Sequence, residues 1–439
     1  MTVNPITWSE LSSEAQAALL ERPALRDHRE VVDAAANIIA AVRRDGDAAM
    51  LDFARQFEGA DLQSLKVSAS EIRAAEAALA ADSIAAIDAA IANVRRFHEA
   101  QVPAPIDLDT APGVRCQRIG HPIDAVGLYV PAGSAPLPST AIMLSVPAAI
   151  AGCPTRILCT PPNASGDVDA ATLFAAARSG VTDIFKAGGA QAIAAMAYGT
   201  ESVPRVQRIF GPGNTWVTAA KSLVAGDPAG ASIDSPAGPS EVLVVADDSA
   251  DPRFVAADLL SQAEHGEDSQ VILVTDCRQL IERTLSNIEE QLGRLKRREI
   301  AQVALRHARM IVTDTLEAAV EVSNHYAPEH LILQTRDSRA LLARVRNAGS
   351  VFLGRWSPES VGDYCSGTNH VLPTYGAAKS YSGLGVEQFM RHMTVQELTE
   401  DGLRSLAPSV YSLAALEGLD AHAAAVRLRL AGPDGVEVR

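Results

Sequence analysis

From about Gly113 onward, short runs rich in β-branched residues alternate with Ala-rich stretches that have helical spacing. Strands that alternate with helices indicate βαβ units, and therefore parallel sheets covered by helices. Because so many strands do not fit one compact unit, we expect two Rossmann-like α/β lobes with incomplete doubly wound parallel sheets. The predicted strands are Ala125–Val130, Arg156–Cys159, Asp183–Phe185, Arg208–Phe210, Glu241–Val245, Val271–Thr275, Met310–Thr313 and Ser350–Leu353.

We expect one lobe to be inserted into the other, because Pro- and Gly-rich stretches at 131–138 and 235–239 are typical of crossings. A chain of 439 residues is long enough for two or three domains. Residues 1–24 would form an N-terminal arm, and the Ala-rich stretches that follow it to about residue 100 read as helices. Residues 25–129 and 239–378 would form one lobe, and residues 130–238 the inserted lobe. Residues 379–439 read as a helical tail without strands.

Charge and composition exclude several classes of function. The net charge of −15, with a sequence pI of about 5.1 and no basic stripe, argues against a nucleic-acid partner. Residues 1–10 lack the features of a signal peptide, and the longest apolar run, 141–153, is interrupted by Ser145 and Pro147, so no membrane association is expected. Five scattered cysteines without a C-x-x-C pair fit a reducing compartment, and we expect a cytoplasmic protein.

The segment 'DLLSQAEHG' (258–266) reads as the end of a helix stopped by Gly266. Gln262 and His265 are three residues apart and therefore share one face of that helix. An amide oxygen and an imidazole nitrogen on one face can form half of a metal site. The alternative is a histidine that caps the helix or lies on the surface.

Two further segments carry acid–base and ligand groups. In 'NHYAPEH' (324–330), Glu329 and His330 stand side by side after a proline. Histidine is suited to remove a proton from an alcohol near neutral pH, and glutamate can activate a water; the alternative is a solvated turn. The polar loop 'WSPESVGDYCSGTNH' (356–370) holds Glu359, Asp363 and His370. Such loops concentrate ligand groups, and Asp363 is a candidate metal ligand.

Three glycine turns follow predicted strands: 'PAGS' (131–134), 'AGGAQ' (187–191) and 'GPGN' (211–214). Backbone amides in such turns can hold phosphates at the start of a helix. The dinucleotide fingerprint G-x-G-x-x-G is absent, because Trp216 stands where its third glycine would fall. Each turn alone could be a tight connection, but three turns in one lobe favour a ligand crevice.

The remaining candidates are isolated in the sequence. His422 lies on an Ala-rich helical stretch and reads locally as a surface residue. Cys116, Cys153 and Cys365 could each be proposed as the nucleophile of an aldehyde oxidation. None has a base nearby in sequence, so we favour buried or supporting thiols.

Taken together, these segments resemble the histidinol dehydrogenase family over nearly the whole chain from about residue 25. The resemblance implies the last step of histidine biosynthesis, in which L-histidinol is oxidised to L-histidinaldehyde and then to L-histidine while two NAD are reduced in turn. The matching stretches are 'VGLYVPAGSAPLPST' (126–140), 'AGGAQAIAAMAYGT' (187–200), 'GPGNTWV' (211–217), 'GPSEVLV' (238–244), 'LLSQAEHGEDSQV' (259–271), 'NHYAPEHL' (324–331), 'ESVGDYCSGTNHVLPT' (359–374), 'GLGVEQFMRH' (383–392) and 'GLDAHAAAVRLR' (418–429).

The same resemblance implies a role for individual residues. His330 matches the base of the alcohol oxidation, and Glu329 matches the residue that activates water against the aldehyde. One zinc per site would hold the substrate, with ligands at Gln262, His265, Asp363 and His422. NAD contacts would be Tyr129, Gln191 and Asn214. Substrate contacts would be Ser240, Gln262, His265, His330, Glu359, Asp363, His370, Glu417 and His422.

The family forms homodimers whose C-terminal tails cross to the partner. By that pattern, His422 and Glu417 would complete the site of the other subunit. The sequence departs from many relatives at Ala132, where they carry a glycine, and we expect no functional consequence because alanine is tolerated where φ is negative.

Two other functions are considered. A related zinc- and NAD-dependent dehydrogenase could act on another small alcohol, such as a sulfonated diol, but the combination of Ser240, Glu359, His370 and Glu417 favours histidinol. A zinc hydrolase without NAD could use Glu329 and zinc to activate water. The glycine turns would then be simple connections, and calorimetry would find no NAD binding.

Overall fold

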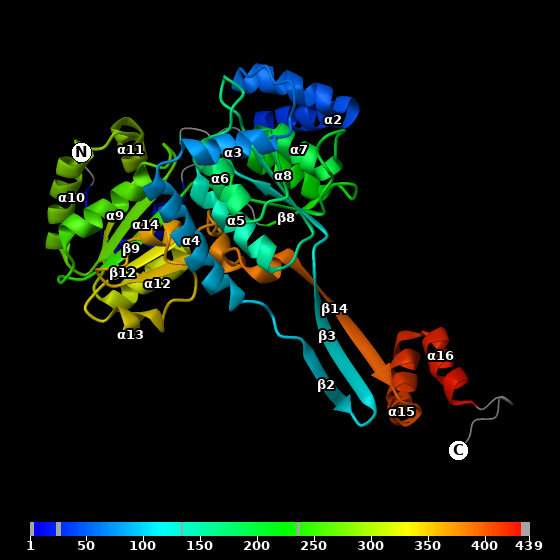
Figure 1. The fold of residues 1–439 in the computed structure, drawn as a ribbon. Helices are drawn as coiled ribbons and strands as arrows, with labels where there is room; N and C mark the ends of the chain where they lie inside the picture. The colour runs from blue at the N-terminus through cyan, green and yellow to red at the C-terminus, as the bar shows by residue number, and fades with distance from the viewer. Residues whose placement is uncertain (1–3, 23–27, 133–134, 235–237, 432–439) are drawn as a thin grey trace. The chain divides into compact units, whose positions relative to one another are not determined.

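The computed structural model describes residues 4–22, 28–132, 135–234 and 238–431. The chain divides into two compact units. Unit 1 comprises Met1–Gln101 and Ile123–Phe389, and unit 2 comprises Val102–Pro122 and Met390–Arg439. Figure 1 shows the helices and strands of both units.

One half of unit 1 is built on a five-stranded parallel sheet with the strand order β6-β5-β4-β7-β8. From β4 the chain proceeds outward to β5 and β6, and then returns to the other side of β4 at β7. The order therefore reverses between β4 and β7, and such a switch point is where open α/β sheets bind ligands. The elements are β4 (Ala125–Tyr129), α5 (Pro138–Ile150), β5 (Thr155–Thr160), α6 (Ala170–Arg178), β6 (Asp183–Lys186), α7 (Gly189–Tyr198), β7 (Arg208–Phe210), α8 (Thr215–Gly226) and β8 (Ser232–Ile233).

The N-terminal helices pack against this half: α2 contacts α7 and α8, α3 contacts α6, and α4 contacts α5 (Figure 1). They are α2 (His28–Phe53), the π-helical η2 (Ala54–Glu58), α3 (Ala69–Ala78) and α4 (Ala81–Glu99). The sequence predicts that residues 25–129 belong to the same lobe as residues 239–378. In the structure, these helices instead pack on the half built on the five-stranded sheet, and β4 is a strand of that sheet. The reason is that helical periodicity predicts which face is buried but not which sheet it is buried against.

No single helix in the described part of the chain is long and apolar enough to cross a membrane. The helices α3 and α4 meet that test of length and composition only as a pair, across a bend of 112°. Their apolar faces join the buried cluster that includes Val94, Val126 and Met143.

The other half of unit 1 is a six-stranded parallel sheet with the order β1-β11-β10-β9-β12-β13. Alternate residues of β9 enter separate buried clusters: Val242 and Val244 pack with α9 and α10, whereas Leu243 and Val245 pack with α12. The elements are β1 (Ile6–Thr7), η1 (Trp8–Glu10), α1 (Ser13–Leu19), β9 (Glu241–Ala246), α9 (Pro252–Ala263), β10 (Gln270–Thr275), α10 (Arg278–Leu292), α11 (Arg298–Ala304), η3 (Leu305–His307), β11 (Arg309–Val312), α12 (Leu316–Tyr326), β12 (His330–Gln334), α13 (Ser338–Leu342), β13 (Ser350–Leu353), α14 (Glu359–Tyr364), η4 (Ala377–Lys379) and η5 (Val386–Phe389).

The predicted strands are all present to within a residue at either end, and the predicted fold class is confirmed. Strand β12 was not predicted. Its residues 'HLILQ' are all buried, and a short apolar run of this kind does not distinguish a central strand from a buried helical segment.

Unit 2 contains an antiparallel sheet with the order β14-β3-β2, followed by two helices that contact each other. Its elements are β2 (Ile106–Ala111), β3 (Val114–Pro122), β14 (Met390–Leu398), α15 (Glu400–Glu417) and α16 (Asp420–Leu430). The C-terminal helices were expected, but the prediction of a tail without strands is wrong for β14. Since β14 pairs with a strand far away in sequence, no local hairpin signal marks it.

Candidate active site

The expected acid–base residues and three of the four expected metal ligands, Gln262, His265 and Asp363, gather at the amino-terminal edge of the six-stranded sheet. His330 is the first residue of β12, and Ser240 immediately precedes the neighbouring strand β9. Gln262 lies in the last turn of α9, which leads back to the same edge, and His265 follows two residues after the end of that helix. Ligands of α/β sheets usually lie at the carboxyl edge, so the general rule would not have located this site.

A group of potential cation ligands lies at this edge. One ligand atom from each of His265, Glu359 and Asp363 lies within 4.8 Å of the other two. The last two residues are four apart on α14 and therefore share a helix face. His265 is accessible to solvent, but the protein packed around its ring lowers its pKa through desolvation, against the opposing effect of Asp363. A lowered pKa keeps the imidazole neutral, as metal binding requires.

Gln262 is fully buried beside this group. When its amide is oriented to satisfy its surroundings, the nitrogen donates to Glu359 Oε1 at 3.0 Å and to the backbone oxygen of Glu241 at 3.2 Å, and lies 3.0 Å from His330 Nδ1. This orientation leaves the amide oxygen as the atom that can bind a ligand. Two of the expected zinc ligands, His265 and Asp363, are thus members of the group, and Gln262 adjoins it through Glu359.

The fourth expected ligand, His422, belongs to unit 2, where it is exposed on α16. Glu417 is the last residue of α15 and is also exposed. Neither is a member of the group formed by His265, Glu359 and Asp363. The structure adds Glu359 to the potential cation ligands, whereas the sequence suggested only a substrate contact for it.

Glu329 and His330 form a buried pair next to the cation-binding group. The Glu241 backbone N–H donates to Glu329 Oε2 at 2.8 Å, and burial raises the pKa of Glu329 to about 8. Burial opposes a charge on His330, but the carboxylates of Glu329, Glu359 and Asp363 outweigh it and raise the His330 pKa to about 10.

The two ring nitrogens of His330 have different surroundings. Nδ1 lies 3.1 Å from the Glu241 backbone oxygen, whereas Nε2 is buried, 3.6 Å from Asp363 Oδ1, and has no hydrogen-bond partner. A buried polar atom without a partner is costly unless a ligand supplies one. Nε2 is therefore the ring nitrogen to which a bound ligand could supply the missing partner.

Ser240 and His370 lie next to members of the cation-binding group. Ser240 Oγ lies 3.5 Å from His265 Nδ1. In His370, Nδ1 lies 2.8 Å from the Asp363 backbone oxygen, and Nε2 lies 3.3 Å from Thr140 Oγ1. Since Thr140 belongs to α5, His370 connects this site to the half of unit 1 that contains the five-stranded sheet.

The residues expected to contact NAD lie at the carboxyl edge of the five-stranded sheet. Tyr129 ends β4, and its hydroxyl accepts a hydrogen bond from Gly189 N at 3.0 Å. Gln191 lies in the first turn of α7, and Asn214 caps α8 by accepting from the amides of residues 216 and 217. Tyr129 and Asn214 flank the switch point between β4 and β7. In the first glycine turn, residues 133 and 134 lie outside the described residues.

Glycine is required at two of these turns. Gly189 has φ +57°, and Gly211 has φ +125°. A Cβ at Gly211 would lie 2.2 Å from the backbone oxygen of Tyr129, so only glycine allows this close approach.

Glu58 is a site residue that the sequence did not indicate. Its Oε1 accepts a hydrogen bond from Gln191 Nε2 at 3.2 Å, and its Oε2 is buried without a partner. Burial raises the pKa of Glu58 to about 7. It ends a π-helical segment and belongs to no motif, so no local signal could have identified it.

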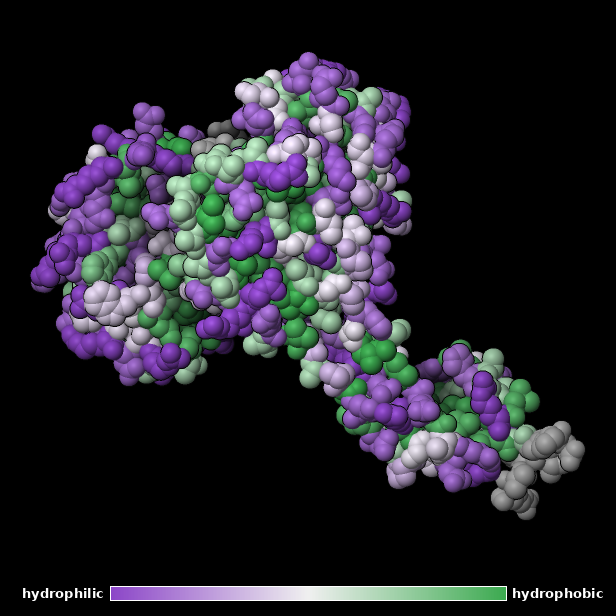
Figure 2. Space-filling view, in the orientation of Figure 1, coloured by the Kyte–Doolittle hydropathy of each residue, from purple (hydrophilic) through white to green (hydrophobic). Residues whose placement is uncertain are grey.

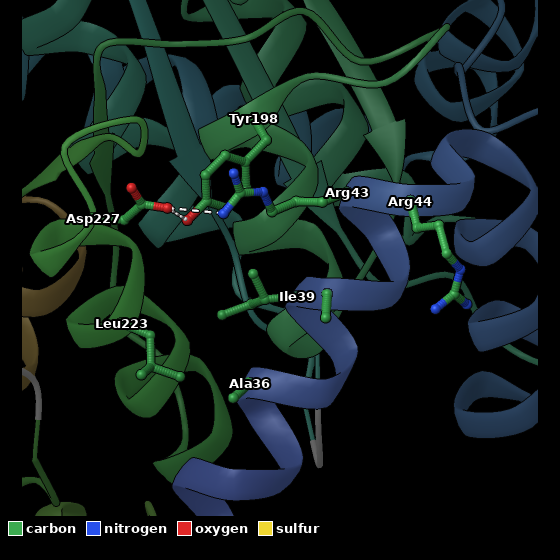
Figure 3. Close-up of a pocket in the computed structure, with 8 residues that line it drawn as sticks. Ala36, Ile39, Arg43, Arg44, Tyr198, Leu223 and Asp227 are labelled. Carbon is green, nitrogen blue, oxygen red and sulfur yellow. Dashed lines mark hydrogen bonds and ion pairs between the residues drawn. The ribbon is translucent and has the colours of Figure 1, made fainter.

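A hollow of about 540 Å³ lies elsewhere, between α2, α7 and α8, and contains none of the expected site residues (Figure 3). Its polar groups satisfy one another: Arg43 donates to Asp227 at 2.9 Å and lies over the Tyr198 ring, whose hydroxyl also donates to Asp227. We assign it no role in catalysis.

Burial raises the pKa of Cys153 to about 11, and its thiol lies 3.5 Å from the Phe389 oxygen. Cys116 belongs to β3, and Cys365 is exposed after α14. A thiol with a raised pKa is a poor nucleophile, which supports a packing role for Cys153.

Fold and site together define an α/β enzyme with two parallel sheets, glycine turns at the switch point of one sheet and a buried acid–base pair at the edge of the other. Residues 21–430 match the family model "Histidinol dehydrogenase". The chain therefore belongs to the histidinol dehydrogenase family, and it is a dehydrogenase.

Individual relatives agree with this family. The chain is 51% identical to the histidinol dehydrogenase of Vibrio parahaemolyticus, over 97% of this chain and 98% of that protein. It is 53% identical to a putative histidine biosynthesis bifunctional protein of Photorhabdus laumondii, over 97% of this chain and 52% of that protein. The crystal structure of histidinol dehydrogenase from Elizabethkingia anophelis is similar with a TM-score of 0.92 and 44% identity, covering 96% of both chains.

Proposed function

We propose that this chain oxidises L-histidinol to L-histidine through L-histidinaldehyde, as the last step of histidine biosynthesis, and reduces two NAD in turn. The observation that carries the proposal is the buried pair of Glu329 and His330 beside the group of His265, Glu359 and Asp363. It supplies a proton acceptor for each oxidation next to groups that can hold a polar substrate.

The residues at this edge fit a zinc ion. Gln262, His265 and Asp363 would hold it, together with His422 of a second copy of the chain. A neutral imidazole and carboxylates are donors that zinc binds, and the amide oxygen of Gln262 is a further oxygen donor. When bound, zinc would supply positive charge that holds the imidazole and amino groups of histidinol and offsets the carboxylates around His330.

In the first oxidation, His330 Nε2 accepts the proton of the substrate hydroxyl while hydride leaves the same carbon for the nicotinamide of NAD. This requires the neutral ring, and positive charge near Asp363 would lower the raised pKa of His330 toward that state. The Glu241 backbone oxygen, 3.1 Å from Nδ1, orients the ring.

In the second oxidation, Glu329 accepts a proton from a water whose oxygen adds to the aldehyde carbon. Hydride then leaves the resulting hydrate for a second NAD, and the carboxylate of L-histidine remains. Burial raises the pKa of Glu329 to about 8, which brings its proton affinity close to the working pH of a general base.

The five-stranded sheet would bind NAD through Tyr129, Gln191 and Asn214. Support comes from the position of Tyr129 and Asn214 at the switch point and from the glycine turns that lead into α7 and α8, because the N-terminus of a helix favours a negatively charged group such as a pyrophosphate. All three residues lie next to the glycine turns, which explains how NAD could bind without the dinucleotide fingerprint.

We also propose that two copies of the chain exchange their C-terminal tails, so that His422 and Glu417 complete the other copy's site. Both residues are exposed in unit 2. This unit also exposes Leu413, Leu416 and Leu428, at 60%, 84% and 76%, and Figure 2 shows apolar side chains among the polar ones on its surface. Large apolar side chains with this much exposure support a contact with another protein chain.

The test is absorbance at the NADH band with L-histidinol, NAD and purified protein, before and after chelation. We expect about two NADH per histidinol, with activity lost on chelation and restored by zinc. If histidinol yields no NADH, the proposed substrate is wrong, and other small alcohols such as sulfonated diols would be examined.

A further inference from the structure

Arg22, at the end of the N-terminal arm, reaches the first residue of β9. Its Nε donates to Glu241 Oε1 at 2.5 Å and its Nη2 to Oε2 at 3.0 Å. The two side chains are only 12% and 2% exposed. This is a bidentate ion pair, the strongest and most directional form of an Arg–carboxylate contact, and it is buried at the same edge as the candidate active site.

The backbone of Glu241 contacts both candidate catalytic residues. Its N–H donates to Glu329 Oε2 at 2.8 Å, and its oxygen lies 3.1 Å from His330 Nδ1. The same oxygen accepts from the Gln262 amide at 3.2 Å. The position of Glu241 therefore determines the positions of a proton acceptor for each half-reaction and of an expected zinc ligand.

Arg22 also contacts the segment that leads into these residues. Its Nη2 donates to the backbone oxygens of Tyr326 at 2.8 Å and Ala327 at 3.4 Å, and its guanidinium lies 4.0 Å from the centre of the Tyr326 ring. Ala327 is followed directly by Pro328, Glu329 and His330. One side chain thus ties together the start of β9 and the approach to β12.

Backbone strain is found at the same place. Among the described residues, Ala327 and Tyr375 are the two non-glycine residues with positive φ, at 55° and 59°. Arg22 binds the oxygen of Ala327, and the Tyr375 N–H donates to Glu241 Oε1 at 2.9 Å. Such conformations persist where the surrounding structure holds them, and they concentrate at functional sites.

We propose that Arg22 and Glu241 form a positioning pair that holds Glu329 and His330 in their working places. This inference rests on the proposed roles of Glu329 and His330. The parallel pairing of β9 with β12 would survive the loss of Arg22, but the turn at Ala327 would lose the contact that holds it. Arg22 of the N-terminal arm would then act on catalysis through Glu241 and the turn at Ala327.

The test compares Arg22→Met and Arg22→Lys with Arg178→Met as a matched control. Arg178 forms a bidentate pair with Asp88, but that pair is exposed. Hydrogen exchange followed by mass spectrometry would be measured on metal-free protein, and kcat and KM on zinc-loaded protein. For Arg22→Met we expect faster exchange in peptides covering 322–331, a kcat lowered about tenfold or more and a KM for NAD within about twofold of the original. Arg22→Lys should recover part of kcat, and Arg178→Met should change nothing.

Unchanged exchange at 322–331 in Arg22→Met would overturn the proposal, and so would an unchanged kcat. The double variant Arg22→Met with Glu241→Gln separates positioning from general stability, because it removes the unpaired buried charge. If the double variant has a higher melting temperature than Arg22→Met but an equally low kcat, the positioning role is supported. If both the melting temperature and kcat recover in the double variant, the positioning role is overturned. The exchange measurement needs no turnover, so it tests the inference even if the unmodified protein fails to oxidise histidinol. That failure would count against the proposed function alone.

Discussion

At the scale of single residues, a substitution of Glu329 should slow the second of the two proposed half-reactions and spare the first. Glu329→Gln keeps an oxygen that can accept from the Glu241 N–H, but the amide cannot take a proton from water. We expect oxidation of supplied L-histidinaldehyde to fall by about 10²- to 10⁴-fold, while oxidation of histidinol to the aldehyde keeps most of its rate. NADH formation measured separately with each substrate checks this. Equal losses in both steps would contradict the separate role of Glu329.

Glu58 predicts a pH dependence of stability. Its pKa is raised from 4.5 to about 7 in the folded chain, so the folded state binds the proton more tightly than the unfolded state does. The stabilisation is therefore complete below pH 4.5 and is lost as the pH rises to about 7. Relative to Glu58→Gln, which has no such proton, the original protein should lose thermal stability over this range. Melting temperatures of both proteins at several pH values test this, and a pH-independent difference would contradict it.

At the scale of elements, the turn between β7 and α8 depends on Gly211. Gly211→Ala would place a Cβ 2.2 Å from the Tyr129 oxygen at φ +125°. Backbone strain of this kind costs about 1–3 kcal/mol, which corresponds to roughly 5- to 150-fold weaker binding where the turn must keep its shape. We expect calorimetry to show this loss for NAD. Gly226→Ala, at the other end of α8, meets no atom within 4 Å and serves as the control.

A buried ion pair links α8, which follows the same turn, to Asp234, the residue directly after β8. Lys221 Nζ contacts Asp234 and donates to the Gly211 oxygen at 2.9 Å, and the two side chains are 2% and 5% exposed. Lys221→Met leaves a buried carboxylate without its partner, which we expect to lower the free energy of unfolding by about 3–5 kcal/mol. Adding Asp234→Asn should recover much of this loss. Denaturant unfolding of the single and double variants tests it, and a double variant no more stable than the single one would contradict it.

At the scale of the whole molecule, exchanged tails make a prediction about mixed dimers. His265→Ala damages the site of its own copy, whereas His422→Ala would damage the site of the other copy. A heterodimer of the two inactive variants then contains one intact site and one doubly damaged site. Random mixing should restore about a quarter of the original activity. If His422 acts within its own copy, every site in the mixture is damaged and no activity returns.

The sequence by itself determined the fold class and most of its strands. Runs such as 'VLVV' at 242–245 are apolar throughout because helices cover both faces of a parallel sheet, and this property is local. Long motifs likewise identified the family. They also indicated the candidate residues that the structure places at the amino-terminal edge of the six-stranded sheet and at the carboxyl edge of the five-stranded sheet. These signals are local because burial and turn geometry act on neighbouring residues.

Only the tertiary structure decided which distant segments meet. It placed His330 at the start of a central strand, added Glu359 to the group of His265 and Asp363, paired β14 with β3 and brought Arg22 to Glu241. Periodicity reports which side of an element is buried, but not its partner, because the partner depends on how the sheets pack and where the chain closes its loops. The contacts that would position the catalytic residues arise from that packing.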